Sequence, residues 1–292
     1  MNKLHLAGII PIANLKSDFD LKTPEVLLPI NPDFTAIQKS VFECALAGCS
    51  TIWIVANDDL APIVRKIIGE WIYDPVYYRG ISKFSSEERK EIPIYYVPIH
   101  PKDANRRDSY GWSVLYGIYT AWKVANNVSR WIEPDKYYVS FPMSVYDIYQ
   151  VRSHRRLIAD PKNNFFLTFD GQTVKDNIPL SFTMMGEDFK RCRKSVNKKT
   201  TKEYLPPLEG QQYPSKKIPL KDRWSARYFK LEDVFEDIND EGAHAADVSW
   251  YYDISKWSGY RAFLRSENSI ETPEAGLTKP RQHVKIPYKE EG

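Results

Sequence analysis

Short apolar runs alternate with longer amphipathic stretches along the first half of the chain. The runs are six or seven residues long and mostly apolar, which is typical of strands buried on both faces of a sheet. They span residues 6–12, 51–56, 94–99 and 136–141. Between these runs, apolar residues recur with the spacing of a helix over residues 35–48, 59–71 and 111–127. Strands that alternate with helices of this length require right-handed crossovers, so the pattern predicts an α/β domain with a mainly parallel sheet.

The second half, after about residue 160, has a less regular pattern. FFLTFDGQTV (165–174) predicts a strand and a glycine turn, and IPLSFTMM (178–185) predicts the return strand of a hairpin. Residues 228–238 favour a short amphipathic helix, and the aromatic segment 250–264 ends the predicted folded part. The remaining residues, 266–292, are polar with scattered prolines and predict an extended tail.

Aromatic residues make up 14% of the chain. Tyrosine and tryptophan suit a core, and they suit a surface that stacks on bases or sugars equally well. The abundance of aromatic side chains therefore leaves both interpretations open. The net charge of +3 is too small to indicate that the whole molecule binds nucleic acid.

Cysteine usage and hydropathy bear on the compartment. Cys44, Cys49 and Cys192 form an odd set without metal-type spacing, so we expect free, buried thiols in a reducing compartment. The apolar start of the chain is too short for a signal-peptide core, and no stretch approaches the roughly 20 apolar residues of a membrane span. These observations predict a cytoplasmic protein that makes no membrane contact.

One segment stands apart by its charge. FKRCRKSVNKKTTK (189–202) contains seven basic residues and no acidic one, and Phe189 and Tyr204 lie at its ends. Basic side chains beside aromatic ones can bind a phosphate-rich polymer. The same composition also fits an exposed helix and loop. The sequence thus offers a polyanion or protein contact through 189–202 and a plain solvated surface as alternatives.

Several segments carry a resemblance by their order. These are IIPIAN (9–14), TPEVLLPI (23–30), a helix ending in AGC, STIWIVAND (50–58), GWS (111–113), YYVSFP (137–142) and DISKWSGY (253–260). The set resembles the sugar-1-phosphate nucleotidyltransferases, above all the UTP–glucose-1-phosphate uridylyltransferases. The resemblance implies a three-layer nucleotide-diphospho-sugar-transferase-like, Rossmann-like fold with a mainly parallel mixed sheet. It also implies a nucleotide-binding half over 1–160, a sugar-side half with irregular insertions over 161–265, and a C-terminal tail over 266–292.

The same resemblance assigns roles around the nucleotide. Ala13 and Asn14 would line its phosphates, and Lys22 would offset their charge. Gly111 and Trp112 match a turn against which the base packs, although a plain strand-to-helix turn explains them as well. The expected ligands are a nucleoside triphosphate or a nucleotide sugar, together with a sugar phosphate.

The resemblance assigns the metal and the sugar phosphate to the segment DISKWSGY (253–260). In the family, two carboxylates hold Mg²⁺ while a sugar phosphate attacks the α-phosphorus of a nucleoside triphosphate. Asp253 matches one of these carboxylates, and capping of the following helix is its alternative role. Lys256 matches a lysine near the sugar phosphate, shifted by one position.

Three departures from the family pattern fall on the phosphate and metal positions. The loop ANLKSDFD (13–20) replaces a glycine-rich run, and Asn14 is the residue type there that best tolerates a left-handed backbone. Either Lys16 or Lys22 could replace the basic side chain that the family has in this loop. Glu25 stands at a lysine position, with Lys22 three residues away as the substitute. Met143 stands at the position of the second metal aspartate, and a thioether is a poor ligand for Mg²⁺.

These departures leave three functions open. A divergent nucleotidyltransferase-like protein would bind a nucleotide or nucleotide sugar and, if active, release pyrophosphate with Mg²⁺. A catalytically inactive scaffold on the same fold would instead bind a partner through its aromatic or basic surface. A glycosyltransferase normally has an Asp-x-Asp pair after a strand, and none follows the four strands predicted above.

Overall fold

The computed structural model describes residues 4–19, 21–78, 90–104, 106–107, 109–128, 133–200, 204–205, 207–214, 216–219, 223 and 225–273. Within these residues an eight-stranded sheet forms the centre, in the order β11-β9-β10-β7-β1-β4-β6-β5. The strands are β1 (Leu6–Pro11), β4 (Thr51–Ala56), β5 (Trp71–Tyr73), β6 (Glu91–Pro98), β7 (Lys136–Val139), β9 (Phe165–Thr168), β10 (Phe182–Met185) and β11 (His244–Asp247). Strands β7, β1, β4 and β6 run parallel, whereas β5 and β10 are antiparallel to their neighbours.

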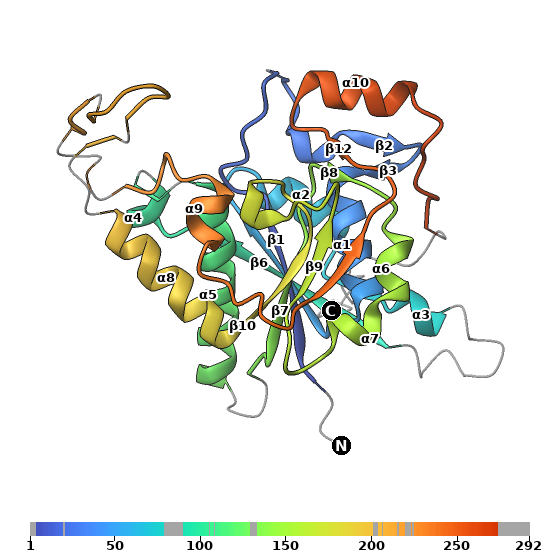
Figure 1. The fold of residues 1–292 in the computed structure, drawn as a ribbon. Coiled ribbons are helices and arrows are strands. Elements are labelled where there is room, and N and C mark those ends of the chain that lie inside the picture. Colours follow the sequence, from blue (N-terminus) through green and yellow to red (C-terminus); the bar gives the residue numbers. More distant parts are fainter. Residues whose placement is uncertain are drawn as a thin grey trace, which may run out of the picture.

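Helices cover both faces of this sheet, which gives three layers (Figure 1). One face carries α5 (Tyr110–Val128), α8 (Gly186–Lys199) and α9 (Leu231–Phe235), and the other carries α1 (Ala36–Ala47), α6 (Tyr149–Ser153) and α7 (Arg155–Ile158). The remaining elements are η1 (Glu25–Leu27), β2 (Pro29–Asn31), β3 (Phe34–Thr35), α2 (Ala61–Ile68), α3 (Pro75–Tyr78), α4 (Pro101–Ala104), β8 (Ser144–Val145), η4 (Val174–Asp176), β12 (Tyr252–Asp253) and α10 (Trp257–Arg265).

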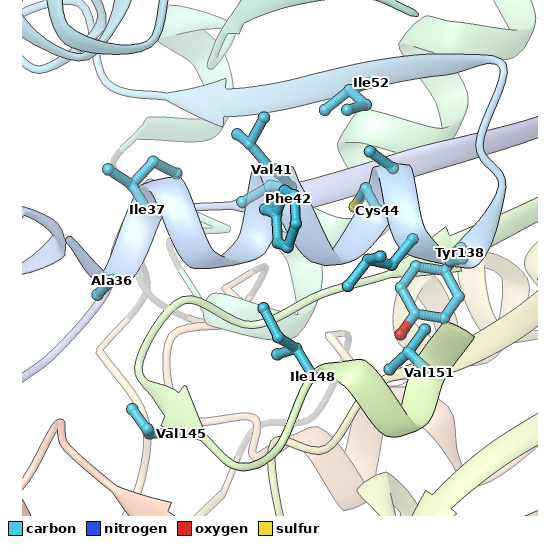
Figure 2. Close-up of a cluster of buried hydrophobic side chains, with 14 of the residues drawn as sticks. Ala36, Ile37, Val41, Phe42, Cys44, Ile52, Tyr138, Val145, Ile148 and Val151 are labelled. Carbon is cyan, nitrogen blue, oxygen red and sulfur yellow. The ribbon is translucent and has the colours of Figure 1, made fainter. Parts of the chain in front are cut away.

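The hydrophobic core is divided by the sheet because successive side chains of a strand point to opposite faces. On β1, Ile10 belongs to the cluster beneath α1, and Ile9 belongs to the cluster beneath α5. Figure 2 shows the first cluster, in which Val41 and Phe42 of α1 lie among side chains from the strands and from α6. Full burial of one such side chain contributes about 1.5–3 kcal/mol, so the two clusters hold the layers together.

Local signals in the sequence set the ends of α1. Gln38 Oε1 accepts a hydrogen bond from Thr35 N at 2.8 Å, which satisfies a free amide at the helix start. The helix ends at Gly48, whose φ of 94° lies in the left-handed region. Both ends agree with the prediction of a helix over 35–48.

The predicted fold class is confirmed, with a mixed, mainly parallel sheet between helical layers. The predicted hairpin is present because β9 and β10 pair antiparallel. Strands of the predicted sugar-side half join the same sheet as those of the first half, and β11 closes one edge beside β9. The predicted helix over 228–238 is shorter, spanning Leu231–Phe235 as α9. Of the predicted tail, residues 274–292 lie outside the described residues.

The three cysteines are free and buried, as predicted. None of the helices in the described part of the chain has the length and hydropathy that a membrane-spanning segment needs.

Candidate functional site

A cavity of about 390 Å³ lies beyond the carboxyl ends of β1 and β7. These two parallel strands are neighbours, but the chain leaves β1 towards α1 on one face and reaches β7 from α5 on the other. In doubly wound sheets, ligands bind where the connections of two neighbouring strands run to opposite faces of the sheet. The position of the cavity therefore marks it as the candidate site.

The loop after β1 forms one wall. Ile12 N and Ala13 N both donate to Val55 O at 2.9 Å, which turns the chain away from the sheet. Asn14 then adopts a φ of 58°, so the left-handed turn expected at this residue is present. Asn14 lines the cavity, and its buried Nδ2 has no partner among the described residues.

Ala13 does not line the cavity, contrary to its predicted contact with phosphate. Its side chain is fully buried in the core, and its carbonyl accepts a hydrogen bond from Ser113 Oγ at 3.1 Å. Ala13 thus ties the loop to α5, and its neighbour Asn14 lines the cavity.

The beginning of α5 forms a second wall. Ser109, Tyr110 and Gly111 line the cavity, and Ser109 Oγ accepts a hydrogen bond from Trp112 N at 3.3 Å. Burial raises the pKa of the Tyr110 hydroxyl, and Asp253 adds to this shift. Tyr110 is therefore a neutral hydrogen-bond donor, and its hydroxyl has no partner among the described residues.

Trp112 lies in the core rather than at the cavity. Its side chain is 3% exposed, and the Arg107 guanidinium lies 4.5 Å from its ring centre. The Trp112 ring therefore does not face the cavity, and the packing of a base against the Gly111–Trp112 turn stays a prediction. Gly111 does line the cavity; a Cβ there would lie 2.8 Å from Val234 Cγ2, because α9 packs closely against α5.

The third wall of the cavity contains Met143 and Asp253. Strands β8 and β12 pair antiparallel, which places Asp253 opposite Ser144, and Ile254 N donates to Met143 O at 2.8 Å. Asp253 Oδ1 accepts hydrogen bonds from both the backbone N and the hydroxyl of Ser255. Asp253 Oδ2 lies 3.4 Å from Lys256 Nζ. Asp253 therefore holds the turn before α10, but it does not cap the helix itself, because the N-cap residue is Lys256.

Helix α10 approaches this wall unusually closely. A Cβ on Gly259 would lie 2.1 Å from Asp253 O, so no larger residue fits without a shift of the backbone. Asp18 fixes the opposite loop to the same turn, since Asp18 N donates to Ser255 O at 3.0 Å and Asp18 Oδ1 accepts from Trp257 N at 2.6 Å. The walls that carry Asn14 and Asp253 are thereby held together.

A buried ion pair supports the floor of the cavity. Lys39 Nζ donates to Phe141 O at 3.0 Å and to Ser144 O at 2.8 Å, on either side of Met143. It also pairs with Glu43 Oε2 at 3.1 Å, and both side chains are fully buried. Hydroxyl groups provide four further hydrogen bonds to Glu43, from Tyr138, Ser140, Tyr146 and Ser181. Burial lowers the pKa of Lys39, and the charge of Glu43 opposes that shift.

Positive charge predominates around the cavity. Lys16, Arg227, Lys230 and Lys256 line it, against the single carboxylate of Asp253 among the described residues. Of the two lysines expected from the sequence, Lys16 lines the cavity, whereas Lys22 is exposed and lies outside the lining. Arg227 and Lys230 belong to no motif of the resemblance, and no local pattern indicates that they reach the site.

No family model matches the sequence, and no curated protein matches it. Several solved structures, in contrast, match this chain. A protein assigned as a glucose-1-phosphate thymidylyltransferase from Bacillus anthracis, crystallised with sucrose, matches 91% of this chain and 98% of its own at 11% identity, with a TM-score of 0.52. A UDP-glucose pyrophosphorylase crystallised with UDP-glucose matches 89% and 97% at 10% identity, with a TM-score of 0.49. A nucleoside-diphosphate-sugar pyrophosphorylase from Vibrio cholerae matches 89% and 100% at 12% identity, with a TM-score of 0.46.

The chain has the fold of the sugar-1-phosphate nucleotidyltransferases. The sequence identity to the Bacillus anthracis protein is only 11%, so the likeness concerns the arrangement of the helices and strands.

The residues at the metal positions of this nucleotidyltransferase fold do not suit Mg²⁺. Asp253 is the only carboxylate in the described lining, and Met143 stands where the resemblance expects a second one. Both oxygens of Asp253 already have partners in Ser255 and Lys256. Among the described residues, no group of three or more histidine, cysteine, aspartate or glutamate side chains is placed to hold a metal ion.

The basic segment 189–202 lies apart from the cavity, mainly in α8, and residues 201 and 202 are outside the described part of the chain. Lys190, Arg193, Lys194 and Lys198 line a shallow groove along one face of α8. Arg193 also lies 4.1 Å from the ring centre of Tyr119 on α5. Phe189 lines the same groove but is only 6% exposed, so little of its ring is open to stacking.

Proposed function

We propose that this chain binds a nucleotide or a nucleotide sugar in the cavity between β1, α5 and β12, with the phosphates among Lys16, Arg227, Lys230 and Lys256. The observation that carries the proposal is the excess of four cations over one carboxylate around a cavity at the point where the sheet connections part. Charge-assisted hydrogen bonds from lysine and arginine are the strong contacts available to a phosphate.

Uncharged donors support the same assignment. Asn14 Nδ2 and the Tyr110 hydroxyl are buried at the cavity without partners among the described residues. A buried donor of this kind costs about 1–3 kcal/mol while it is unsatisfied. Phosphate or sugar oxygens would satisfy both groups. The α5 N-terminus at Ser109–Gly111 adds backbone amides and a favourable dipole for an anion.

Lys256 is the residue we propose to meet the sugar side of the ligand. It lies on the α10 wall beside Asp253, across the cavity from the loop that carries Asn14. A nucleotide sugar would span these walls with its diphosphate between them. Transfer of a nucleotidyl group to a sugar 1-phosphate remains a prediction, measured by pyrophosphate release.

The inactive scaffold on the same fold is the alternative. A cavity filled by bulky side chains would favour it, whereas an open cavity with polar walls favours ligand binding. Tyr110 and Met143 do line the site, but they leave about 390 Å³ of space. The observations therefore support a ligand-binding protein.

Isothermal titration of the full chain with UDP-, GDP- and dTDP-sugars and with nucleoside triphosphates, with and without Mg²⁺, tests the proposal. We expect at least one of these compounds to bind, and Lys230→Met to weaken that binding about tenfold, or about 1.4 kcal/mol. Lys194→Met on α8 removes the same charge outside the cavity and is the matched control. Absence of binding by the whole panel, or equal loss in both variants, would overturn the proposal.

The groove on α8 is a second candidate contact, which we propose to bind a polyanion. The favouring observation is the placement of four basic residues on one helix face. Such binding weakens steeply as salt rises, because counterions are released from the polymer. Heparin affinity that is independent of salt, or unchanged in a Lys190→Glu, Lys194→Glu variant, would contradict it.

A further inference from the structure

We propose that the cavity binds its diphosphate ligand without a divalent metal ion, and that Lys256 supplies at Asp253 the positive charge that such an ion would supply. This inference rests on the proposed function and specifies how the same site meets the charge of its substrate.

The first observation is the state of Asp253. Its Oδ1 accepts two hydrogen bonds from Ser255, from the backbone N at 3.1 Å and from the hydroxyl. Its Oδ2 faces Lys256 Nζ at 3.4 Å. A metal ion would have to displace the ammonium group and compete with the turn that Ser255 holds. The lysine already neutralises this carboxylate, so a second cation gains little there.

The second observation is the residue beside Asp253. Ser144 lies across from Asp253 in the β8–β12 pair. Met143 O accepts a hydrogen bond from Ile254 N, and both Met143 and Asp253 line the cavity. A carboxylate at residue 143 would complete a pair of hard oxygen ligands. The methionine present is 2% exposed and offers only a thioether, which is a soft donor. Mg²⁺ demands hard oxygen ligands in near-octahedral geometry.

The third observation is the balance of charge. The described lining carries four cations and one carboxylate, and its cations come from three separate segments, at Lys16, at Arg227 and Lys230, and at Lys256. This arrangement can surround a phosphate group from several sides. Part of this positive charge is already balanced, because Lys256 pairs with Asp253 and Lys230 Nζ lies 3.2 Å from Glu232 Oε1. A nucleoside diphosphate or nucleotide sugar, which carries less charge than a triphosphate, matches the remainder better. The structure therefore favours a diphosphate-bearing substrate over a Mg²⁺–triphosphate complex.

The decisive experiment is isothermal titration of the full chain with UDP-, GDP- and dTDP-glucose, once in EDTA and once in millimolar Mg²⁺. We expect binding in EDTA that is as tight as in Mg²⁺, or tighter, because Mg²⁺ masks phosphate charge that the lysines recognise. Binding that requires Mg²⁺ would overturn the inference and leave the proposed function standing. Absence of binding under both conditions would overturn the proposed function and the inference with it.

Two variants separate a lysine-neutralised carboxylate from a metal ligand. Lys256→Met should weaken binding in EDTA about tenfold, and Mg²⁺ should not restore it. Asp253→Asn keeps an oxygen for Ser255 but removes a negative charge near the phosphates, so it should tighten binding in EDTA about threefold. Loss of binding in Asp253→Asn, with an unchanged circular dichroism spectrum, would contradict the inference, since that loss is expected of a metal ligand.

Discussion

Replacement of Lys39 by methionine tests whether the buried ion pair holds the floor of the cavity. Methionine keeps the length of the side chain but removes the ammonium group that donates to Phe141 O, Ser144 O and Glu43. Glu43 would then remain fully buried without its counter-ion. Removing one partner of a buried ion pair costs about 3–5 kcal/mol, and we expect the Lys39→Met variant to lose stability within this range.

Urea unfolding followed by far-ultraviolet circular dichroism measures the loss, with the free energy taken by linear extrapolation. Lys66→Met on α2 removes an exposed lysine and should change stability by less than about 0.5 kcal/mol. Because Ser144 and Met143 line the cavity, Lys39→Met should also weaken nucleotide-sugar binding under folding conditions. A loss below about 1 kcal/mol would refute the reasoning, since it would show that Glu43 does not depend on Lys39.

Three further predictions concern single residues. Gly259→Ala should lower the melting temperature and weaken ligand binding together, because the added Cβ meets Asp253 O at 2.1 Å; a variant with normal melting and binding contradicts this. Met143→Asp should place a second carboxylate in the cavity that Asp253 lines, so that Mg²⁺ raises the melting temperature of the variant but not of the natural chain; equal responses in differential scanning fluorimetry contradict it. Asp160 accepts hydrogen bonds from Lys162 N, which has the largest effect, and from His244 and Asn163, and these bonds lower its pKa to about 2. Its carboxylate therefore stabilises the fold fully above about pH 4 and loses this effect as the pH falls through about 2. The stability difference between the natural chain and Asp160→Asn, measured by urea unfolding, should shrink over that interval, and a constant difference contradicts the assignment.

The parallel core of the fold could be predicted because its signals are local. Each of β1, β4, β6 and β7 is an apolar run, and helices such as α1 carry their own start and stop signals at Thr35 and Gly48. Edge strands are harder to predict. Strand β11 (His244–Asp247) has only one buried residue, Ala246, so its pattern resembles a polar loop, and its pairing with β9 depends on the rest of the sheet.

The candidate site could be predicted where a motif fixes the backbone. Asn14, Gly111, Asp253 and Lys256 were expected from three separate segments, and the structure brings all four to one cavity. Their proposed roles in binding remain predictions. The left-handed turn at Asn14 followed from the residue type alone, since asparagine tolerates a positive φ.

The rest of the site depends on tertiary packing that no local pattern encodes. Trp112 follows Gly111 directly, yet one step along a helix turns its side chain into the core. Arg227 and Lys230 reach the cavity because α9 docks on α5, where Val234 meets Gly111. Lys22 and Lys16 lie in one loop, and the path of that loop, held by Asp18 at Ser255, decides which of them lines the cavity.

A crystal structure of the full chain grown in EDTA with the best-binding nucleotide sugar tests the central claim most directly. The account predicts density for the diphosphate in the cavity between Asn14 and Lys256, with no metal ion at Asp253. An empty cavity at saturating ligand, or density only along α8, would contradict it.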